Sequence, residues 1–346
     1  MTTIAPRRPW VSTPRDRIRD AVIFIAIIAA TLAIVEFTAF SGKLGYVIVF
    51  IFLYGTTTAI QGFLKYGRRA ISESIAKTAI AFGAFITLVP IASIVATVIA
   101  KGYKGISLNL FTQDMSMATP TDPLTNGGVL HAITGTLTLV GIALIISVPL
   151  GILTALYLTE VKGRLTRPIR FLVQAMSGVP SIVAGLFILS AVLYPITKGY
   201  SALMGSLALS ILMIPTIART SEEVLNLIPN ELREAGVALG GTQWRSVAMI
   251  VLPAARSGLV TAMILGVARI AGETAPLLLL TGGGDKVNPN PFHDSVGSLP
   301  YYIWKSFNAG SPEAITRAWA GLLVLLIVIL VLFTSARLLS SRKGAR

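Results

Sequence analysis

Long runs without a charged residue are the feature that most constrains this chain. About 20 apolar residues, folded as a helix, cross the hydrocarbon core of a bilayer. Only 13% of the 346 residues are charged, about half of what soluble chains carry. The chain is therefore predicted to be an all-α polytopic membrane protein. Six stretches lack Lys, Arg, Asp and Glu altogether: 44–64, 78–100, 123–159, 171–197, 199–218 and 318–336.

These runs, together with two others, predict eight membrane-spanning helices. The two others are placed at 21–40 and 257–280, which include charged residues. The third uncharged run has 37 residues, too many for one helix, so its span is placed at 137–158. Residues 127–136 are then an interfacial lead-in to that span. The fourth run has 27 residues, so its span is expected to tilt or to overhang the bilayer.

The distribution of Lys and Arg predicts the orientation of the spans. If the N-terminus is cytoplasmic, the inner segments hold 21 of these residues and the outer segments hold 7. Cytoplasmic loops are enriched in Lys and Arg, so both termini are predicted to be cytoplasmic. Residues 1–20 are basic and are followed by no small-residue cleavage site, which favours a cytoplasmic arm over a cleaved signal peptide. The net charge of +14 is thereby assigned to membrane topology and not to nucleic-acid binding.

Several kinds of site are excluded by the residues that are missing from the sequence. There is no Cys, and His131 and His293 lie too far apart in the sequence to form a metal-ligand pattern. His131 is interpreted as an interfacial polar residue. The chain lacks the G-x-x-x-x-G-K-[ST] pattern, and its glycine run at 282–284 does not have the Lys and the helix that a phosphate loop needs. No cofactor, metal or catalytic site is therefore expected on this chain.

One cytoplasmic loop, residues 219–256, is long and patterned. Pro229 and Asn230 interrupt the chain before residues 231–239, whose composition predicts a helix with acidic residues in its first turn. Gly240 and Gly241 end that helix. A short helix followed by a glycine turn at the cytoplasmic face suits docking into a partner, although an ordinary amphipathic surface helix has the same pattern.

The spacing within this loop resembles the EAA motif of ABC importer permeases. Glu234-Ala235-Gly236 is followed by three residues, then Gly240, then nine residues and the segment 250–253 (IVLP). The one departure is Gly236, where a second Ala is usual. The resemblance implies a coupling helix that fits a cleft of a cytoplasmic ATP-binding subunit, with ATP and Mg on that partner. The residues expected to make this contact are Glu231, Glu234, Ala235, Gly236 and Gly240.

Two charged residues fall within the seventh predicted span. A charge at the centre of a membrane helix costs about 2.5–3.5 kcal/mol on insertion scales and usually faces protein or water. Arg269 and Glu273 are four residues apart, so they are expected to share a helical face and to pair. The pair either fixes helix packing or provides a cationic station on an anion path. Arg suits a tetrahedral oxyanion because its planar fork donates two parallel hydrogen bonds.

A third charge, Arg219, lies at the inner end of the sixth predicted span, after Pro215. Hydropathy leaves open whether Arg219 lines a path or anchors the helix at the membrane surface. Thr216, Thr220 and Thr274 are candidate neutral ligands for the same anion, although Thr often bonds its own helix.

Four segments resemble the PstA family of phosphate transporter permeases: ARIAGETAPLLL at 268–279, GGVLHAITGTL at 127–137, GVPSIVAGLF at 178–187 and PTIARTSEEVL at 215–225. The sister family PstC tends to differ after the R-x-x-G-E segment. The resemblance covers about residues 75–346 and implies a type I ABC importer permease fold with a six-helix core, which here is residues 76–346. Residues 1–75 would then be a cytoplasmic arm with two extra membrane helices.

The resemblance also implies a function and partners. Arg219, Arg269 and Glu273 match positions implicated in phosphate passage, and Thr220 and Thr274 are added as candidates. The expected partners are a PstC-like permease, a dimer of PstB-like ATP-binding subunits and a PstS-like phosphate-binding protein, with membrane lipid around them and no nucleic acid. The expected location is the bacterial inner membrane. The outer loop that begins at residue 281, taken as a whole, would dock the phosphate-binding protein. Its individual aromatic residues suit an interfacial belt.

Three alternatives remain open on the residues alone. The arginines suit other oxyanions, such as sulfate or molybdate, equally well. A secondary transporter would use Arg269 and Glu273 for proton coupling but would need no docking loop. A membrane enzyme ranks third, because no nucleophile–base set or metal site is present.

Overall fold

The computed structural model describes residues 14–37 and 43–341, and these residues are helical apart from connecting loops and one isolated β-bridge between Gly282 and Val296. The basic arm predicted at the N-terminus lies largely outside the described residues. The helices are α1 (Pro14–Phe37), α2 (Lys43–Tyr66), α3 (Arg69–Gly102), η1 (Tyr103–Gly105), α4 (Leu108–Thr112), α5 (Leu130–Leu156), η2 (Tyr157–Val161), α6 (Thr166–Ser177), α7 (Ser181–Ile188), η3 (Leu189–Thr197), α8 (Ala202–Asn226), α9 (Asn230–Ala238), α10 (Gln243–Ser246), η4 (Val247–Val251), α11 (Leu252–Ile270), α12 (Ala275–Leu280), α13 (Leu299–Ala309) and α14 (Pro312–Ser341).

Seven helices of the described chain are long and apolar enough to cross a membrane, and a bent pair brings the number to eight. This confirms the predicted all-helical membrane architecture. The bent pair corrects one expectation, because residues 171–197 do not form one continuous helix. α6 and the helical run that begins at α7 meet at 105°. Pro180 explains the break, because a proline restrains the residue before it from helical geometry and has no N–H to donate.

The seventh predicted span is also interrupted. α11 ends at Ile270 and α12 begins at Ala275, so residues 257–280 are not one helix. Pro276 lies at the start of α12, and a proline at this position favours the beginning of a new helix. The helical run instead extends toward the cytoplasm, from Gln243 to Ile270.

The interfacial lead-in predicted at 127–136 is helical over most of its length. α5 begins at Leu130, three residues after Gly127, whose φ of +73° suits a turn. His131 lies in the first turn of this helix. Its side chain is buried, and its ring lies edge-on to Tyr302 with centroids 5.8 Å apart.

The chain forms two compact units, Met1–Val95 and Ala96–Arg346. In the first unit, α1 packs on α2 through an edge-to-face contact of Phe24 with Phe50. The hydroxyls of Thr58 and Thr78 lie 3.3 Å apart and join α2 to α3. Apolar side chains on these helices are largely exposed, as is typical of surfaces that face lipid.

The second unit is built around α8, of whose span 67% is buried. α5 runs parallel to α8, because Ser206 donates to the carbonyl of Leu139 and, further on, Ser147 donates to the carbonyl of Ser210. α11 packs on α8 from another side. Gly151 of α5 and Gly266 of α11 both lie against Ile217, where a Cβ atom would come within 3 Å of that side chain. Small residues allow such close approach between membrane helices.

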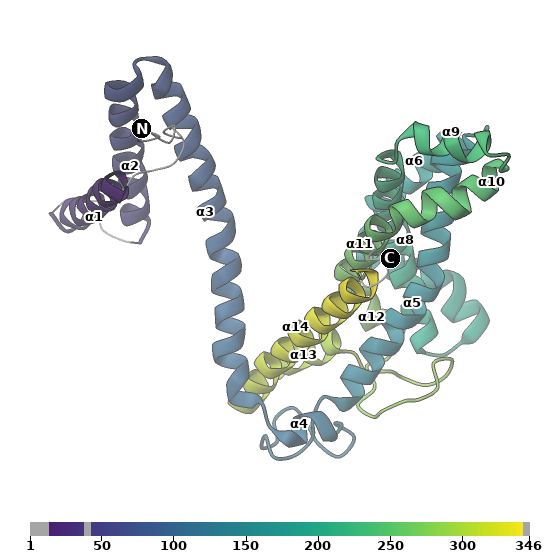
Figure 1. Cartoon of the computed structure of the whole chain (residues 1–346). Coiled ribbons are helices and arrows are strands. Elements are labelled where there is room, and N and C mark those ends of the chain that lie inside the picture. Colours follow the sequence, from purple (N-terminus) through teal and green to yellow (C-terminus); the bar gives the residue numbers. More distant parts are fainter. Residues whose placement is uncertain (1–13, 38–42, 342–346) are drawn as a thin grey trace, which may run out of the picture. The chain divides into compact units, whose positions relative to one another are not determined.

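The two ends of this unit have different contents. Figure 1 shows α6, α9 and α10 gathered at one end, the predicted cytoplasmic end, and α4 at the opposite end. At the outer end, Lys305 pairs with Asp285 at 2.6 Å. The buried Arg317 donates to the carbonyls of Asp122, Pro123 and Asn126. The outer segment includes a helix, α13, that was interpreted as loop from the sequence.

Candidate functional site

The guanidinium of Arg269 joins three parts of the membrane-spanning bundle. Arg269 lies in the last turn of α11 and is half-buried. Its Nη1 donates to Oγ1 of Thr216 on α8 at 2.9 Å. Its Nη2 lies 3.4 Å from the carbonyl oxygen of Ser177, the last residue of α6 before the bend. Arg269 therefore stands where α8, the α6–α7 break and the end of α11 meet.

The predicted pairing of Arg269 with Glu273 is wrong. The expectation assumed a continuous helix, but the helix ends at Ile270 and Glu273 lies in the break before α12. Glu273 donates its backbone N–H to the carbonyl of Ile270, and its side chain is half-buried. Within the described ranges, no ion pair includes either residue.

The other proposed path residues lie on the same two elements. Thr220 is one turn beyond Thr216 on α8 and is half-buried, while Arg219 is exposed on this chain. Thr274 precedes the first residue of α12 and is half-buried. The structure therefore brings Arg269 and Thr216 into contact, but it shows no hydrogen bond that joins Arg219 to them among the described residues.

The surroundings of Arg269 suit an anion. Its protein partners are a hydroxyl and a carbonyl, which are neutral, so its positive charge is not cancelled by a carboxylate. Most of its N–H donors have no partner within the described residues, and a guanidinium fork matches the geometry of an oxyanion. The two helix breaks lie close together, because Gly185 of α7 packs directly against Pro276 of α12.

The second candidate region is the cytoplasmic loop. α9 spans Asn230–Ala238, which agrees with the predicted helix at 231–239. Gly240 follows with φ +81°, and its N–H bonds the carbonyl of Val237. The N–H of Gly241 bonds the carbonyl of Gly236. A left-handed glycine that closes a helix in this way is a common C-terminal cap, and it confirms the predicted glycine stop.

The residues predicted to contact the ATPase differ in their exposure to solvent. Glu231, Glu234, Ala235 and Gly240 are exposed, whereas Gly236 is buried. A Cβ atom at Gly236 would meet the hydroxyl of Ser246 and would lie 2.7 Å from Cδ1 of Ile250. This packing gives a physical reason for glycine at the position where the motif usually has a second alanine.

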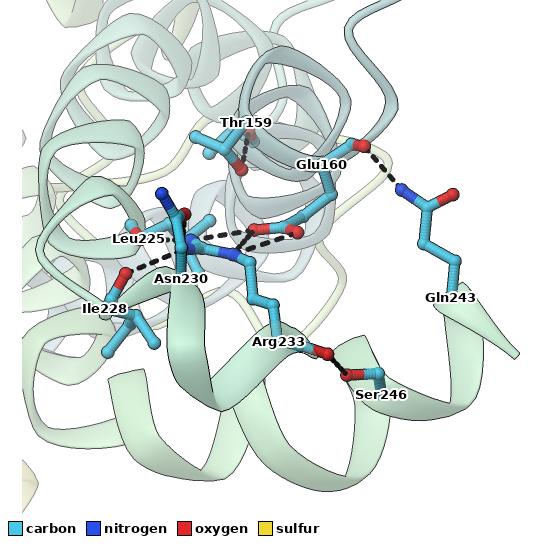
Figure 2. Close-up of polar contacts among 9 residues, drawn as sticks. Thr159, Glu160, Leu225, Ile228, Asn230, Arg233, Gln243 and Ser246 are labelled. Carbon is cyan, nitrogen blue, oxygen red and sulfur yellow. Dashed lines mark hydrogen bonds and ion pairs between the residues drawn. The ribbon is translucent and has the colours of Figure 1, made fainter. Parts of the chain in front are cut away.

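Two residues of this region were missed by the sequence analysis. Arg233 of α9 forms an ion pair with Glu160, which lies in η2 at the end of the α5 helical run (Figure 2). The available signals were weak: Glu160 is the charge that ends the 37-residue uncharged run, and Arg233 directly precedes the EAA glutamate. Neither signal identifies the partner.

Comparison with known proteins gives the family. Residues 147–344 match the family described as "Binding-protein-dependent transport system inner membrane component". The chain is 38% identical over 276 residues to the phosphate transport system permease protein PstA 1 of Mycobacterium tuberculosis (strain CDC 1551 / Oshkosh), covering 79% of this chain and 90% of that protein. It is 37% identical over 250 residues to PstA of Pasteurella multocida (strain Pm70), covering 72% of this chain and 87% of that protein.

Solved structures agree on the fold. A bacterial ABC transporter involved in the import of the acidic polysaccharide alginate aligns with a TM-score of 0.55 and 16% identity, over 79% of this chain and 99% of that chain. An inward-facing MetNI methionine ABC transporter aligns with a TM-score of 0.51 and 21% identity, over 63% of this chain and 95% of that chain. At these identities the likeness concerns the fold alone, and it confirms an ABC importer permease architecture.

These matches decide between the classes that the sequence left open. A binding-protein-dependent transport component is neither an enzyme nor a secondary transporter, so both of those alternatives are wrong. The family description also confirms the expected inner-membrane location. The chain belongs to the family of binding-protein-dependent transport system inner membrane components, as a multi-pass permease of the PstA group.

Proposed function

We propose that this chain is a permease subunit of an ATP-driven importer of inorganic phosphate and forms half of the path through the inner membrane. The relatives that cover most of the chain are phosphate transport permeases by name. One observation on the molecule itself carries the proposal. Arg269 lies within a membrane-spanning helical run, and its partners in the described chain are a hydroxyl and a carbonyl.

The proposed phosphate path passes Arg219, Thr220, Arg269, Glu273 and Thr274. Arg269 binds the anion transiently, because its free N–H donors replace part of the hydration of phosphate. Glu273 limits how tightly the anion is held, since a carboxylate near the anion site repels the negative charge of phosphate. Thr220 and Thr274 add neutral hydroxyl ligands, and Arg219 receives the anion nearer the cytoplasm.

The proposed contact with the ATPase is α9. Glu231, Glu234, Ala235 and Gly240 are exposed on it, and Gly236 fixes the helix against the following segment. As a component of an ABC transport system, the chain works with an ATPase and a binding protein. We assign these partners as a PstB-like ATPase dimer, which carries ATP and Mg, and a PstS-like phosphate-binding protein, with a PstC-like second permease.

We also propose a division of the chain by role. Residues 76–346 form the permease core with its coupling loop 219–256, and residues 1–75 add the arm and two extra membrane helices. The outer loop that begins at residue 281 is the proposed docking surface for the phosphate-binding protein.

The test is uptake of radiolabelled phosphate in cells in which this chain is the sole phosphate permease of its type. We expect phosphate to enter, sulfate and molybdate to stay outside, and uptake to stop when ATP is depleted. Glu234→Lys, at matched membrane levels, is expected to lower uptake at least about ten-fold, because it reverses a charge at the proposed ATPase contact.

Three outcomes contradict the proposal. Uptake of sulfate or molybdate without phosphate would assign a different oxyanion. Uptake that collapses with the proton gradient while ATP is maintained would exclude ATP coupling. Full activity of Glu234→Lys would remove α9 as the coupling element.

A further inference from the structure

The contact between α9 and the α5 helical run is a nearly buried ion pair. The side chain of Glu160 is 6% exposed and that of Arg233 is 21% exposed. Nη2 of Arg233 lies 3.1 Å from Oε1 of Glu160, and Nε lies 3.1 Å and 3.3 Å from the two carboxylate oxygens. The two residues are 73 positions apart in the sequence, so the pair joins distant segments of the chain.

Arg233 also holds the cytoplasmic end of α8. Its Nη2 donates to the carbonyl of Leu225 at 2.7 Å, and its Nη1 donates to the carbonyl of Ile228 at 2.6 Å (Figure 2). The last carbonyls of a helix have no partner within the helix, so a guanidinium that binds them acts as a side-chain cap. One guanidinium thus contacts α8, η2 and its own helix α9.

Two further hydrogen bonds extend this cluster to α10. The side-chain amide of Gln243 donates to the carbonyl of Glu160 at 2.7 Å, and the hydroxyl of Ser246 donates to the carbonyl of Arg233 at 3.3 Å. Figure 2 shows these side chains converging on Glu160 and Arg233. Both α9 and α10 are therefore tied to the end of the α5 helical run.

The proposed ATPase contact lies on the same short helix. Glu231 and Glu234 are exposed on α9, on either side of Arg233 in sequence, whereas Arg233 is half-buried and faces the bundle. A displacement of α9 is therefore transmitted directly to the ends of α5 and α8. α8 also contains Thr216, whose hydroxyl accepts a hydrogen bond from Arg269.

We propose that the Arg233–Glu160 ion pair is the positioning element that makes α9 move as one body with the cytoplasmic ends of α5 and α8. Through it, closure of the ATPase is transmitted to the anion site at Arg269. This inference rests on the proposed function. Arg233 and Glu160 are positioning residues, because they touch neither the transported anion nor ATP. Their loss separates ATP hydrolysis from transport.

A second ion pair provides a matched control. Arg170 of α6 pairs with Glu222 of α8 at 2.6 Å, at the same cytoplasmic end, but neither residue belongs to α9 or α5. The Arg170 side chain is 55% exposed. Arg170→Gln removes an ion pair at this end of the bundle and leaves the contact between Arg233 and Glu160 in place.

The experiment measures phosphate taken up per ATP hydrolysed by the assembled transporter in proteoliposomes. The variants are Glu160→Gln, Arg233→Gln, the double variant and Arg170→Gln, each compared at equal amounts of assembled complex. We expect each single variant to lower the ratio at least about five-fold, and the double variant to be no worse than the lower single, because two residues that act through one contact are not additive. Arg170→Gln should keep the wild-type ratio.

A merely structural role would lower the amount of complex and leave phosphate per ATP unchanged in what assembles. An unchanged ratio in both single variants, or effects that multiply in the double variant, would overturn the inference. If Arg233→Gln does not assemble, the phosphate taken up per ATP hydrolysed is measured with Glu160→Gln and Arg233→Lys instead. Absence of phosphate transport by the wild-type complex would instead overturn the proposed function, so the two failures are distinguishable.

Discussion

Two arginines of this chain show opposite ways of holding a positive charge. Arg233 has a nearly buried carboxylate and two helix-end carbonyls as partners, so its donors are satisfied by the protein. Arg269 has one hydroxyl and one distant carbonyl, and within the described residues no carboxylate pairs with it. The first arrangement fixes structure, because every partner is already in place. The second retains binding capacity for a ligand that carries negative charge.

This difference also explains where the two residues lie. Arg233 is at the cytoplasmic end, where helix termini present carbonyls that need donors. Arg269 lies within the membrane-spanning run, where an unneutralised charge is costly and is retained for a purpose. Variants that give Arg269 a carboxylate partner, or that remove the partners of Arg233, separate the two arrangements.

The largest effect is expected from Thr216→Asp. This change places a carboxylate beside Arg269 and gives it the kind of partner that Arg233 has. The new charge-assisted bond competes with phosphate, and bonds to charged groups contribute about 1.5–3 kcal/mol. Initial phosphate uptake should therefore fall about 10- to 100-fold at matched membrane levels. Thr216→Ser keeps the hydroxyl and should retain most of the activity. Normal uptake by Thr216→Asp would show that Arg269 does not meet the anion.

A smaller effect, on stability, is expected from Arg233→Ala. It leaves Glu160 nearly buried without its cation and removes the guanidinium donors from the carbonyls of Leu225 and Ile228. The expected cost is about 1–3 kcal/mol, below the value for a fully buried pair because Arg233 is partly exposed. The measurement is the thermal unfolding midpoint of the purified chain in detergent.

The matched variant for that measurement is Arg170→Ala, which removes an ion pair whose arginine is 55% exposed. The partner Glu222 is 16% exposed, but solvent around the arginine screens the pair, and pairs of this kind contribute about 0–1 kcal/mol. The midpoint of Arg170→Ala should therefore stay close to wild type. Equal shifts for Arg170→Ala and Arg233→Ala would mean that burial does not distinguish the two pairs.

A still smaller effect is expected from Gly236→Ala. The added methyl group lies too close to Ile250 and Ser246, and overpacking of this kind costs about 1 kcal/mol where a loop can adjust. The unfolding midpoint should fall slightly and protease cleavage of the 219–256 loop should increase. Gly141→Ala on α5, where a Cβ atom has no neighbour within 4 Å, is the control and should be neutral. Equal behaviour of the two variants would contradict the packing argument.

The smallest effect concerns Asp114, whose carboxylate accepts hydrogen bonds from a hydroxyl and from two backbone N–H groups. Burial opposes ionisation of Asp114, but hydrogen bonds from the Ser116 hydroxyl and from the backbones of Ser116 and Val287 lower its pKa below the ordinary 3.8. Because the folded pKa is depressed, its stabilisation is present above the ordinary value and is lost as the pH falls through the folded value.

The measurement for Asp114 is amide hydrogen exchange of the segment around Val287, corrected for the intrinsic pH dependence. Protection in the wild type should decrease below about pH 3.8, the ordinary aspartate range. Asp114→Asn should show weaker protection at neutral pH and no such step. A step of the same size in Asp114→Asn would assign the pH dependence to another group.

The sequence predicts the number and order of the spans well, because uncharged runs report directly on membrane insertion. It does not predict the breaks between α6 and α7 and between α11 and α12, because hydropathy contains no information on backbone geometry. Pro180 and Pro276 lie within apolar runs that look continuous. The same limit produced the mistaken pairing of Arg269 with Glu273, which required a helix that the structure ends at Ile270.

The two arginines also differ in how far they were predictable. Arg269 was identified from the sequence because a charge within an apolar run is conspicuous. Its contact with Thr216 and the pair between Arg233 and Glu160 depend on which helices pack together, and the partners lie 53 and 73 residues apart. A local pattern contains no information on such contacts.

The most direct test of the central claim is the initial rate of phosphate uptake by Arg269→Gln in the assembled transporter, with ATP hydrolysis recorded in parallel. Glutamine keeps a hydrogen-bonding side chain and removes the charge. The account predicts at least about a ten-fold loss of phosphate uptake in complexes that still assemble and hydrolyse ATP. Uptake at the wild-type rate would contradict it and would make Arg269 a packing residue.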